Sequence, residues 1–206
     1  MGKLRDQIIL STKEIALISV LSSVWITSQI YLGPIVGGIT GMHGMVNRLV
    51  GWFLMLILAE LTGKFGRVSI MAAIASLATR MIRASTLEGI VVGFGYILGG
   101  LAFDLLFFIP FANNFLGKTQ IVYPLTVSLV SGIVASIPYL LFKLSFLGLY
   151  GFMAWIPINA YRIVKEVILS VLGVSIGLPA LPRIKVWSLV SLKKKLKRIN
   201  LLPLFK

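Results

Sequence analysis

Long apolar runs, separated only by short connections, place the strongest constraint on this chain. The runs cover residues 15–32, 45–61, 68–82, 87–109, 123–142 and 146–176. A helix needs about 20 mostly apolar residues to cross the hydrocarbon core of a bilayer. Because helices satisfy all their backbone hydrogen bonds internally, they are the natural spanning structure for such runs. The sequence therefore predicts an all-α polytopic membrane protein, a compact bundle of about six transmembrane helices.

Composition supports the same fold class. Of the 206 residues, 58% are hydrophobic and only 13% are charged, whereas soluble domains carry roughly 25% charged residues. A soluble core of this size could not bury so much apolar surface. We expect one transmembrane domain over residues 1–182, followed by a basic segment at 183–206, with no separate soluble domain.

Glycine and proline predict the helix boundaries. Gly33 and Pro34 are expected to end the first helix, and the glycine-rich stretch 33–44 is read as a loop, a re-entrant segment or the start of the second helix. Pro138 is expected to kink the fifth helix and Pro157 the sixth. The basic N-terminus and its long apolar run are read as a retained first helix rather than a cleaved signal peptide.

Positive charge predicts the orientation, because basic residues in short loops favour the cytoplasmic side. The N-terminus, the connection at residues 64–67, Lys118 and the C-terminus would then all be cytoplasmic in a six-helix chain. Arg80, Arg83 and Lys143 disagree with this pattern, since they fall near outer ends. We expect a multi-pass protein of the cell membrane with both termini inside.

The segment 183–206 carries eight basic residues and no acidic one. Its apolar residues are spaced as one helical face, which predicts a basic amphipathic helix lying on anionic lipid at the cytoplasmic surface. Nucleic acid is not expected as a partner, because the rest of the chain is lipid-embedded.

Several kinds of chemistry are not expected. The chain has no cysteine and a single histidine, His43, so neither a metal site nor another cofactor is predicted. Residues 117–119, Gly-Lys-Thr, resemble the end of a phosphate-binding loop, but Ala112 stands where that motif needs a glycine. No nucleophile–base pair is evident either. We therefore expect a protein that is not an enzyme and that holds no nucleotide.

Small residues predict close helix packing. Gly89 and Gly93 are four residues apart, as are Gly95 and Gly99, and this spacing lets membrane helices approach each other closely. The run 68–82 has a similar small face. We interpret these residues as packing positions rather than ligand contacts.

Polar and aromatic residues within the apolar runs predict the substrate site, because buried ionisable groups usually face protein or a cavity. The six-helix topology places seven of them in the outer half of the bundle: Arg48, Arg80, Glu88, Tyr96, Trp155, Asn159 and Arg162. On the last helix, Trp155, Asn159 and Arg162 share one face with Glu166. This face suits a small, flat, polar heterocycle that stacks on the indole and accepts hydrogen bonds.

A structural interpretation of the same residues remains open. Arg162 could pair with Glu166, Glu88 could pair with Arg80, and Trp155 could serve as an interfacial anchor. Glu166, Lys165, Glu60 and Asp104 are placed deeper or toward the cytoplasm.

Three segments carry a resemblance to a known family: Lys-Glu-Ile-Ala-Leu-Ile at 13–18, Gly-Pro-Ile-Val-Gly-Gly at 33–38, and Leu-Glu-Gly-Ile-Val-Val-Gly-Phe-Gly at 87–95. The chain resembles the S component of an energy-coupling factor (ECF) transporter, in particular the hydroxymethylpyrimidine/thiamine branch. The resemblance implies a substrate-binding membrane subunit that captures a vitamin-like molecule from outside. It also implies a transmembrane coupling subunit and two ATPase subunits as partners, with release of the substrate inward.

The resemblance further implies that the first helix docks on the coupling subunit through small residues. Ala16, Ser19 and Ser23 supply such a face here, although the family's Ala-x-x-x-Ala pattern is matched only in part, because Val20 follows Ala16.

Two alternatives stay open at the level of sequence. A self-contained secondary carrier or channel would need an ion-coupling acid, and Asp104 or Glu60 could supply it. An intramembrane enzyme or a structural subunit is the other alternative.

Overall fold

The structure is a computed structural model that describes residues 10–41, 44–82, 86–108, 121–182 and 184. All regular secondary structure in these residues is helical, which confirms the all-α fold class. The elements are α2 (Thr12–Thr27), the π-helix η1 (Ser28–Leu32), α3 (Gly33–Thr40), α4 (Met45–Thr62), α5 (Arg67–Ile82), α6 (Leu87–Phe108), α8 (Val122–Ala154) and α9 (Ile156–Gly177).

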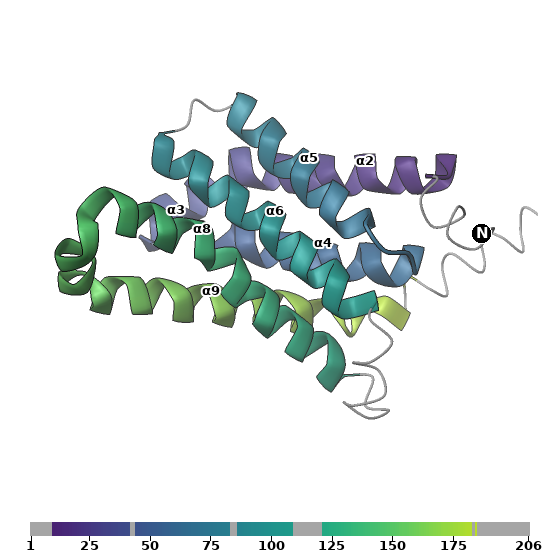
Figure 1. Cartoon of the computed structure of the whole chain (residues 1–206). Coiled ribbons are helices and arrows are strands. Elements are labelled where there is room, and N and C mark those ends of the chain that lie inside the picture. Colours follow the sequence, from purple (N-terminus) through teal and green to yellow (C-terminus); the bar gives the residue numbers. More distant parts are fainter. Residues whose placement is uncertain (1–9, 42–43, 83–85, 109–120, 183, 185–206) are drawn as a thin grey trace, which may run out of the picture.

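The helices run up and down in one bundle (Figure 1). α4 lies at its centre, in contact with α2, α5, α6 and α9, while α8 packs on α6 and α9. α2 begins and α9 ends at the same end of the bundle, which we call the proximal end, whereas α5 ends and α6 begins at the opposite, distal end (Figure 1). The side chains of Trp25, Trp52, Met55 and Phe103 are fully buried in the core around α4.

The first helix does not end at Gly33-Pro34, so that prediction is wrong. α2 continues through η1 into α3 without a loop, and the chain leaves the helix only at Gly41, which has a left-handed φ of 70°. A proline interrupts the hydrogen bonding of a helix. Here the wider π turn directly before Pro34, in which the Gly33 amide donates to the Ser28 carbonyl, accommodates the ring.

The boundary between the last two helices also differs from the prediction. α8 passes Phe142 and continues to Ala154, with a local break at Gly148, whose φ of 66° favours glycine. α9 then starts at Ile156, and Pro157 lies in its first turn rather than at a kink. Proline is well tolerated there because the first amides of a helix have no intrahelical partner.

Within the described residues, four helical segments are long and apolar enough to cross a membrane: Thr12–Thr40, Met45–Thr62, Leu87–Phe108 and Val122–Ala154. α5 has only 16 residues. α9 has 22 residues but carries Arg162, Lys165 and Glu166 near its middle. The two helices that depart from a simple hydrophobic span are thus a short one and a charged one. α5 packs on α2, α4 and α6, and α9 packs on α4 and α8.

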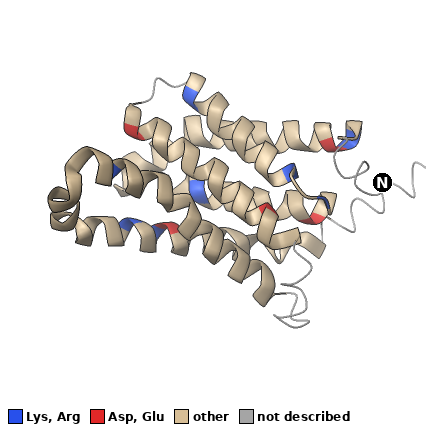
Figure 2. Ribbon diagram, in the orientation of Figure 1, with Lys and Arg blue, Asp and Glu red and all other residues tan. Residues whose placement is uncertain are grey.

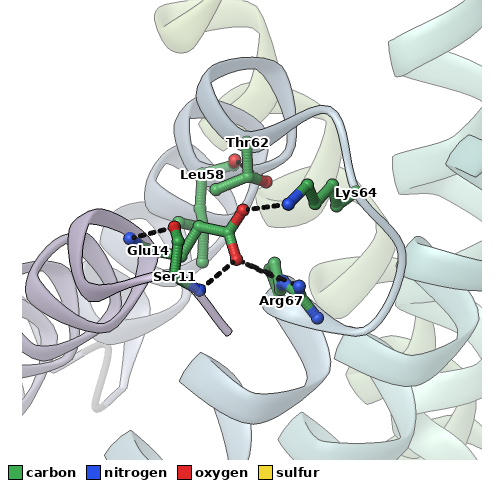
Figure 3. Close-up of polar contacts among 6 residues, drawn as sticks. All are labelled: Ser11, Glu14, Leu58, Thr62, Lys64 and Arg67. Atoms are coloured by element: carbon green, nitrogen blue, oxygen red, sulfur yellow. Dashed lines mark hydrogen bonds and ion pairs between the residues drawn. The ribbon is translucent and has the colours of Figure 1, made fainter. Parts of the chain in front are cut away.

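A polar cluster fixes the proximal end of the bundle (Figure 3). Glu14 and Ser11 form a reciprocal capping box at the start of α2. The Glu14 carboxylate also binds the Lys64 ammonium at 2.7 Å and the Arg67 guanidinium at 3.0 Å, and the side chains of Glu14 and Arg67 are less than 10% exposed. This cluster ties the first turn of α2 to the connection between α4 and α5.

Several predictions concern residues outside the described part of the chain. They include the amphipathic segment 183–206 apart from Ile184, the Gly-Lys-Thr sequence at 117–119, and His43. The membrane-surface role of the C-terminal segment stays a prediction.

Candidate functional site

A small cavity opens toward the distal half of the bundle between four helices. α4 contributes Arg48, α9 contributes Arg162 and Glu166, and the remaining lining residues come from α6 and α8: Val92, Gly95, Tyr96, Ala135, Ser136 and Tyr139. The free space is about 10 Å³, near the lower limit for one water molecule. A vitamin-sized ligand therefore needs side chains of the lining to move apart.

Close packing of α6 and α8 creates the wall of this cavity. A Cβ at Gly95 would lie 2.3 Å from the Ala135 carbonyl oxygen, and a Cβ at Gly99 would lie 2.9 Å from the Ala135 Cβ. On the other side of α6, the Ser76 hydroxyl of α5 donates to the Gly93 carbonyl at 2.8 Å. These contacts show that Gly93, Gly95 and Gly99 are packing positions.

The inner wall of the cavity is an ion pair between α4 and α9. The Arg48 guanidinium binds the Glu166 carboxylate, and the two side chains are 8% and 7% exposed. Both charges lie away from water, where each would be costly without the other. Tyr96 of α6 interacts electrostatically with both groups.

A second charged cluster lies at the rim, joining α6, α8 and α9. The Arg162 guanidinium binds the Glu88 carboxylate at 3.2 Å, and the Lys143 ammonium approaches the same carboxylate at 3.6 Å. Arg162 also lies over the Tyr139 ring, with its guanidinium carbon 3.3 Å from the ring centroid. We call Glu88, Lys143 and Arg162 the rim triad.

The structure brings together some of the seven residues predicted for the site. Arg48, Tyr96 and Arg162 line the cavity, and Glu88 reaches it through Arg162. The structural alternative paired Arg162 with Glu166 and Glu88 with Arg80. The structure instead pairs Arg162 with Glu88 of α6 and Glu166 with Arg48 of α4.

The other three residues lie outside the lining. Trp155 precedes α9 and is 51% exposed, so it does not supply a stacking surface inside the cavity. Asn159 is 6% exposed, and its Nδ2 has no hydrogen-bond partner among the described residues. Arg80 packs beside Gly93 of α6.

Sequence reasoning missed part of the lining. Glu166 was placed too deep, and Tyr139 was not assigned to the site. Helical spacing could have indicated both residues. Glu166 lies one turn beyond Arg162, and Tyr139 follows Ser136 by three residues, so each shares a helical face with another residue of the lining. The small residues Gly95, Ala135 and Ser136 carry no chemical signal and become visible only in the packed bundle.

Asp104, a candidate ion-coupling acid, has a structural role. Its side chain is fully buried, and one carboxylate oxygen accepts hydrogen bonds from the Ser69 amide at 2.7 Å and the Ser69 hydroxyl at 2.6 Å. It thus satisfies the first turn of α5, whose amides have no intrahelical partner. Within the described residues, no group of three His, Cys, Asp or Glu side chains is placed to hold a metal ion.

The predicted docking residues lie on the outside of the bundle. Ala16, Ser19 and Ser23 are all exposed along α2, and the Ser23 hydroxyl donates to the Ser19 carbonyl at 2.8 Å. The opposite face of α2 is buried through Ile18, Ser22 and Trp25. Val20, which is 60% exposed, lies on the exposed side of α2 with these small residues.

Comparison with known proteins yields one likeness that matters for the fold. A solved structure described as the crystal structure of an S-component of ECF transporter matches with a TM-score of 0.57 and 22% sequence identity, over 93% of this chain and 98% of that one. No family model matches the sequence, and no curated protein does either. At this identity the likeness establishes a shared fold over nearly the whole chain, that of a multi-pass membrane protein.

Proposed function

We propose that this chain is the substrate-binding S component of an ECF transporter, a transport subunit and not an enzyme. The observation that carries the proposal is the fold likeness, which extends over 93% of this chain and 98% of the matched one. The polar cavity between α4, α6, α8 and α9 supports it, because buried charges within membrane helices generally mark a substrate path.

The substrate in this proposal is a vitamin or vitamin precursor with a small polar ring. The cavity offers two guanidinium groups, two phenol rings and a carboxylate, which suit a heterocycle with several hydrogen-bonding positions. The sequence resemblance to the hydroxymethylpyrimidine/thiamine branch makes pyrimidines the first compounds to test.

The proposed partners are a transmembrane coupling subunit and two ATPase subunits. The exposed face Ala16, Ser19 and Ser23 would meet the coupling subunit, since small residues allow close helix contact. The basic segment 183–206 would lie on anionic lipid at the cytoplasmic surface, with both termini inside.

Co-expression with candidate coupling and ATPase subunits tests the proposal. We expect the complex to copurify. In proteoliposomes it should take up substrate only when ATP is present on the side of the membrane where the ATPase subunits lie. Ser19→Trp should abolish uptake and leave substrate binding by the isolated chain intact, whereas Ile168→Trp, at an exposed position of α9, should affect neither. Uptake without any ATPase would instead identify a secondary carrier, and the contacts of Asp104 with Ser69 offer that alternative no support.

A further inference from the structure

The rim triad suggests the charge of the ligand. Resting on the proposed function, we propose that the ligand carries an acid group, a carboxylate or a phosphate, that binds Arg162 in the place that Glu88 occupies in this structure. Glu88 then acts as an internal competitor for the site rather than as a ligand contact.

The first support is the balance of charge at the rim. One carboxylate, Glu88, is shared by two cations, Arg162 at 3.2 Å and Lys143 at 3.6 Å. An incoming acid that takes Arg162 leaves Glu88 with Lys143, so each cation gains its own partner. No charge is stranded by the exchange, which keeps the cost of displacing Glu88 low.

Charge around the whole cavity points the same way. Among the described residues, Lys165 interacts electrostatically with Arg48, Arg162 and Glu166, and Arg80 interacts with Tyr96. The cations around the cavity are thus Arg48, Arg80, Lys143, Arg162 and Lys165, and the anions are Glu88 and Glu166. Within a bilayer, such an excess of positive charge favours an anionic ligand and opposes a cationic one.

Exposure separates the exchangeable ion pair from the fixed one. Glu166 and Arg48 are 7% and 8% exposed, so that pair is enclosed by the bundle. Glu88 is 43% exposed and Arg162 25%, so the carboxylate can move into solvent at the distal end. The first turn of α6 is held independently by Thr86, whose hydroxyl accepts from the Gly89 amide at 3.2 Å. Movement of the Glu88 side chain therefore need not disturb the helix.

The geometry of Arg162 suits recognition of an acid. Its guanidinium carbon lies 3.3 Å from the centroid of the Tyr139 ring, and its Nη1 donates to the Glu88 carboxylate at 3.2 Å, so an acid that displaces Glu88 would accept from the same guanidinium. Planar guanidinium groups bind carboxylates and phosphates through paired hydrogen bonds. The ring of the ligand would then lie toward Tyr96 and Ser136, inside the cavity.

The test compares matched acids and neutral analogues on the purified full chain. Hydroxymethylpyrimidine and its phosphate ester form one pair, and pyridine-3-carboxamide and pyridine-3-carboxylate form another. Binding is measured by intrinsic tryptophan fluorescence and by thermal stabilisation in detergent. We expect the acid of at least one pair to bind 10-fold or more tightly than its neutral partner, and thiamine, a cation, to bind more weakly than that acid.

Variants distinguish a competitor role of Glu88 from a purely structural one by the direction in which affinity changes. Glu88→Gln should tighten binding of the acid about 3- to 10-fold by removing the competitor, whereas Arg162→Gln should weaken it more than 10-fold. Glu60→Gln, which removes an acid in the last turn of α4, is the matched control and should leave binding unchanged. Thermal unfolding of every variant establishes that it is folded.

Weaker acid binding in Glu88→Gln would overturn the inference, as would neutral or cationic compounds that bind as well as the acids, or no binding of any acid. Copurification with the ATPase subunits separates this failure from failure of the proposed function. A complex that forms and takes up a neutral or cationic compound would leave the proposed function intact and reject only the acid group.

Discussion

Arg48 and Glu166 form an ion pair that joins α4 to α9, with both side chains less than 10% exposed. The two helices also meet through Gly173, where a Cβ would lie 2.7 Å from the Leu49 carbonyl oxygen. The pair thus sits within a tightly packed interface and forms the inner wall of the cavity. Charged residues lie sparsely along the bundle (Figure 2).

Removal of one partner of this pair should destabilise the protein. Arg48→Met leaves the Glu166 carboxylate buried and unpaired, which typically costs about 3–5 kcal/mol in the free energy of unfolding. The double variant Arg48→Met with Glu166→Gln removes both charges and should recover part of that loss. Denaturation in detergent, followed by tryptophan fluorescence, measures both. Simple addition of the two single effects would contradict the interpretation of the pair as one unit.

The proximal cluster makes a second prediction. Glu14→Gln removes the negative charge that faces Lys64 and the buried Arg67, so we expect a loss of about 1.5–3 kcal/mol, the range for hydrogen bonds to charged groups. Lys13→Gln, at the neighbouring exposed position, should change stability by less than about 0.5 kcal/mol. The same denaturation assay compares them, and equal effects of the two substitutions would reject the role of the cluster.

Glycines with and without close neighbours provide a matched pair. Gly95→Ala places a methyl group 2.3 Å from the Ala135 carbonyl oxygen, and α6 and α8 must move apart to admit it. Overpacking of this kind costs about 1–3 kcal/mol, occasionally more. At Gly38 of α3 an added Cβ meets nothing within 4 Å, so Gly38→Ala should be neutral or slightly stabilising. Thermal unfolding of the two variants distinguishes these outcomes.

Hydrophobic periodicity and length predicted the helices, because burial in lipid requires long apolar runs whatever the fold. Both errors in the predicted helix boundaries arose at residues that often end helices, proline and glycine. Pro34 stays inside a continuous helix because a π turn precedes it, and the α8 break falls at Gly148 rather than near Lys143. Whether a proline or glycine ends a helix depends on the packing around it, and one sequence alone does not contain that packing.

The sequence predicted the depth of several residues of the candidate site but not which of them form ion pairs. Arg48, Tyr96 and Arg162 converge because alternate helices place them at similar depth in the bundle. The partners of Arg162 and Glu166 depend on how α9 is rotated against α4 and α6, which a single sequence does not specify. Trp155 was expected on the same helical face as Asn159, but α9 begins only after it and it lies outside the lining.

Orientation can be tested cleanly because the chain lacks cysteine. Lys13 is exposed at the proximal end, and Met81, near the end of α5, is 87% exposed at the distal end. If both termini are cytoplasmic, an impermeant thiol reagent added to intact cells should label Met81→Cys and spare Lys13→Cys until the membrane is opened. The reverse pattern would invert the proposed topology.

Asn159 and Trp155 were both expected at the site from sequence and both lie outside the cavity lining, but they differ in burial. Asn159 is buried, and its Nδ2 has no hydrogen-bond partner among the described residues. If a ligand or a rearranged cavity accepts a hydrogen bond from this amide, Asn159→Ala removes that hydrogen bond. We expect the affinity for the bound small molecule to fall by about 1–3 kcal/mol. Trp155 is half exposed and outside the lining, so Trp155→Phe should change affinity by less than about 0.5 kcal/mol.

Asp104→Asn is the control for the same titration, since Asp104 caps α5 away from the cavity and should affect stability more than binding. Ligand-induced thermal stabilisation measures all three variants without relying on the Trp155 signal. A large loss of affinity in Trp155→Phe with none in Asn159→Ala would mean that the indole folds over the ligand during binding. That result would place the binding surface at the start of α9, beyond the cavity formed by Arg48, Arg162 and Glu166.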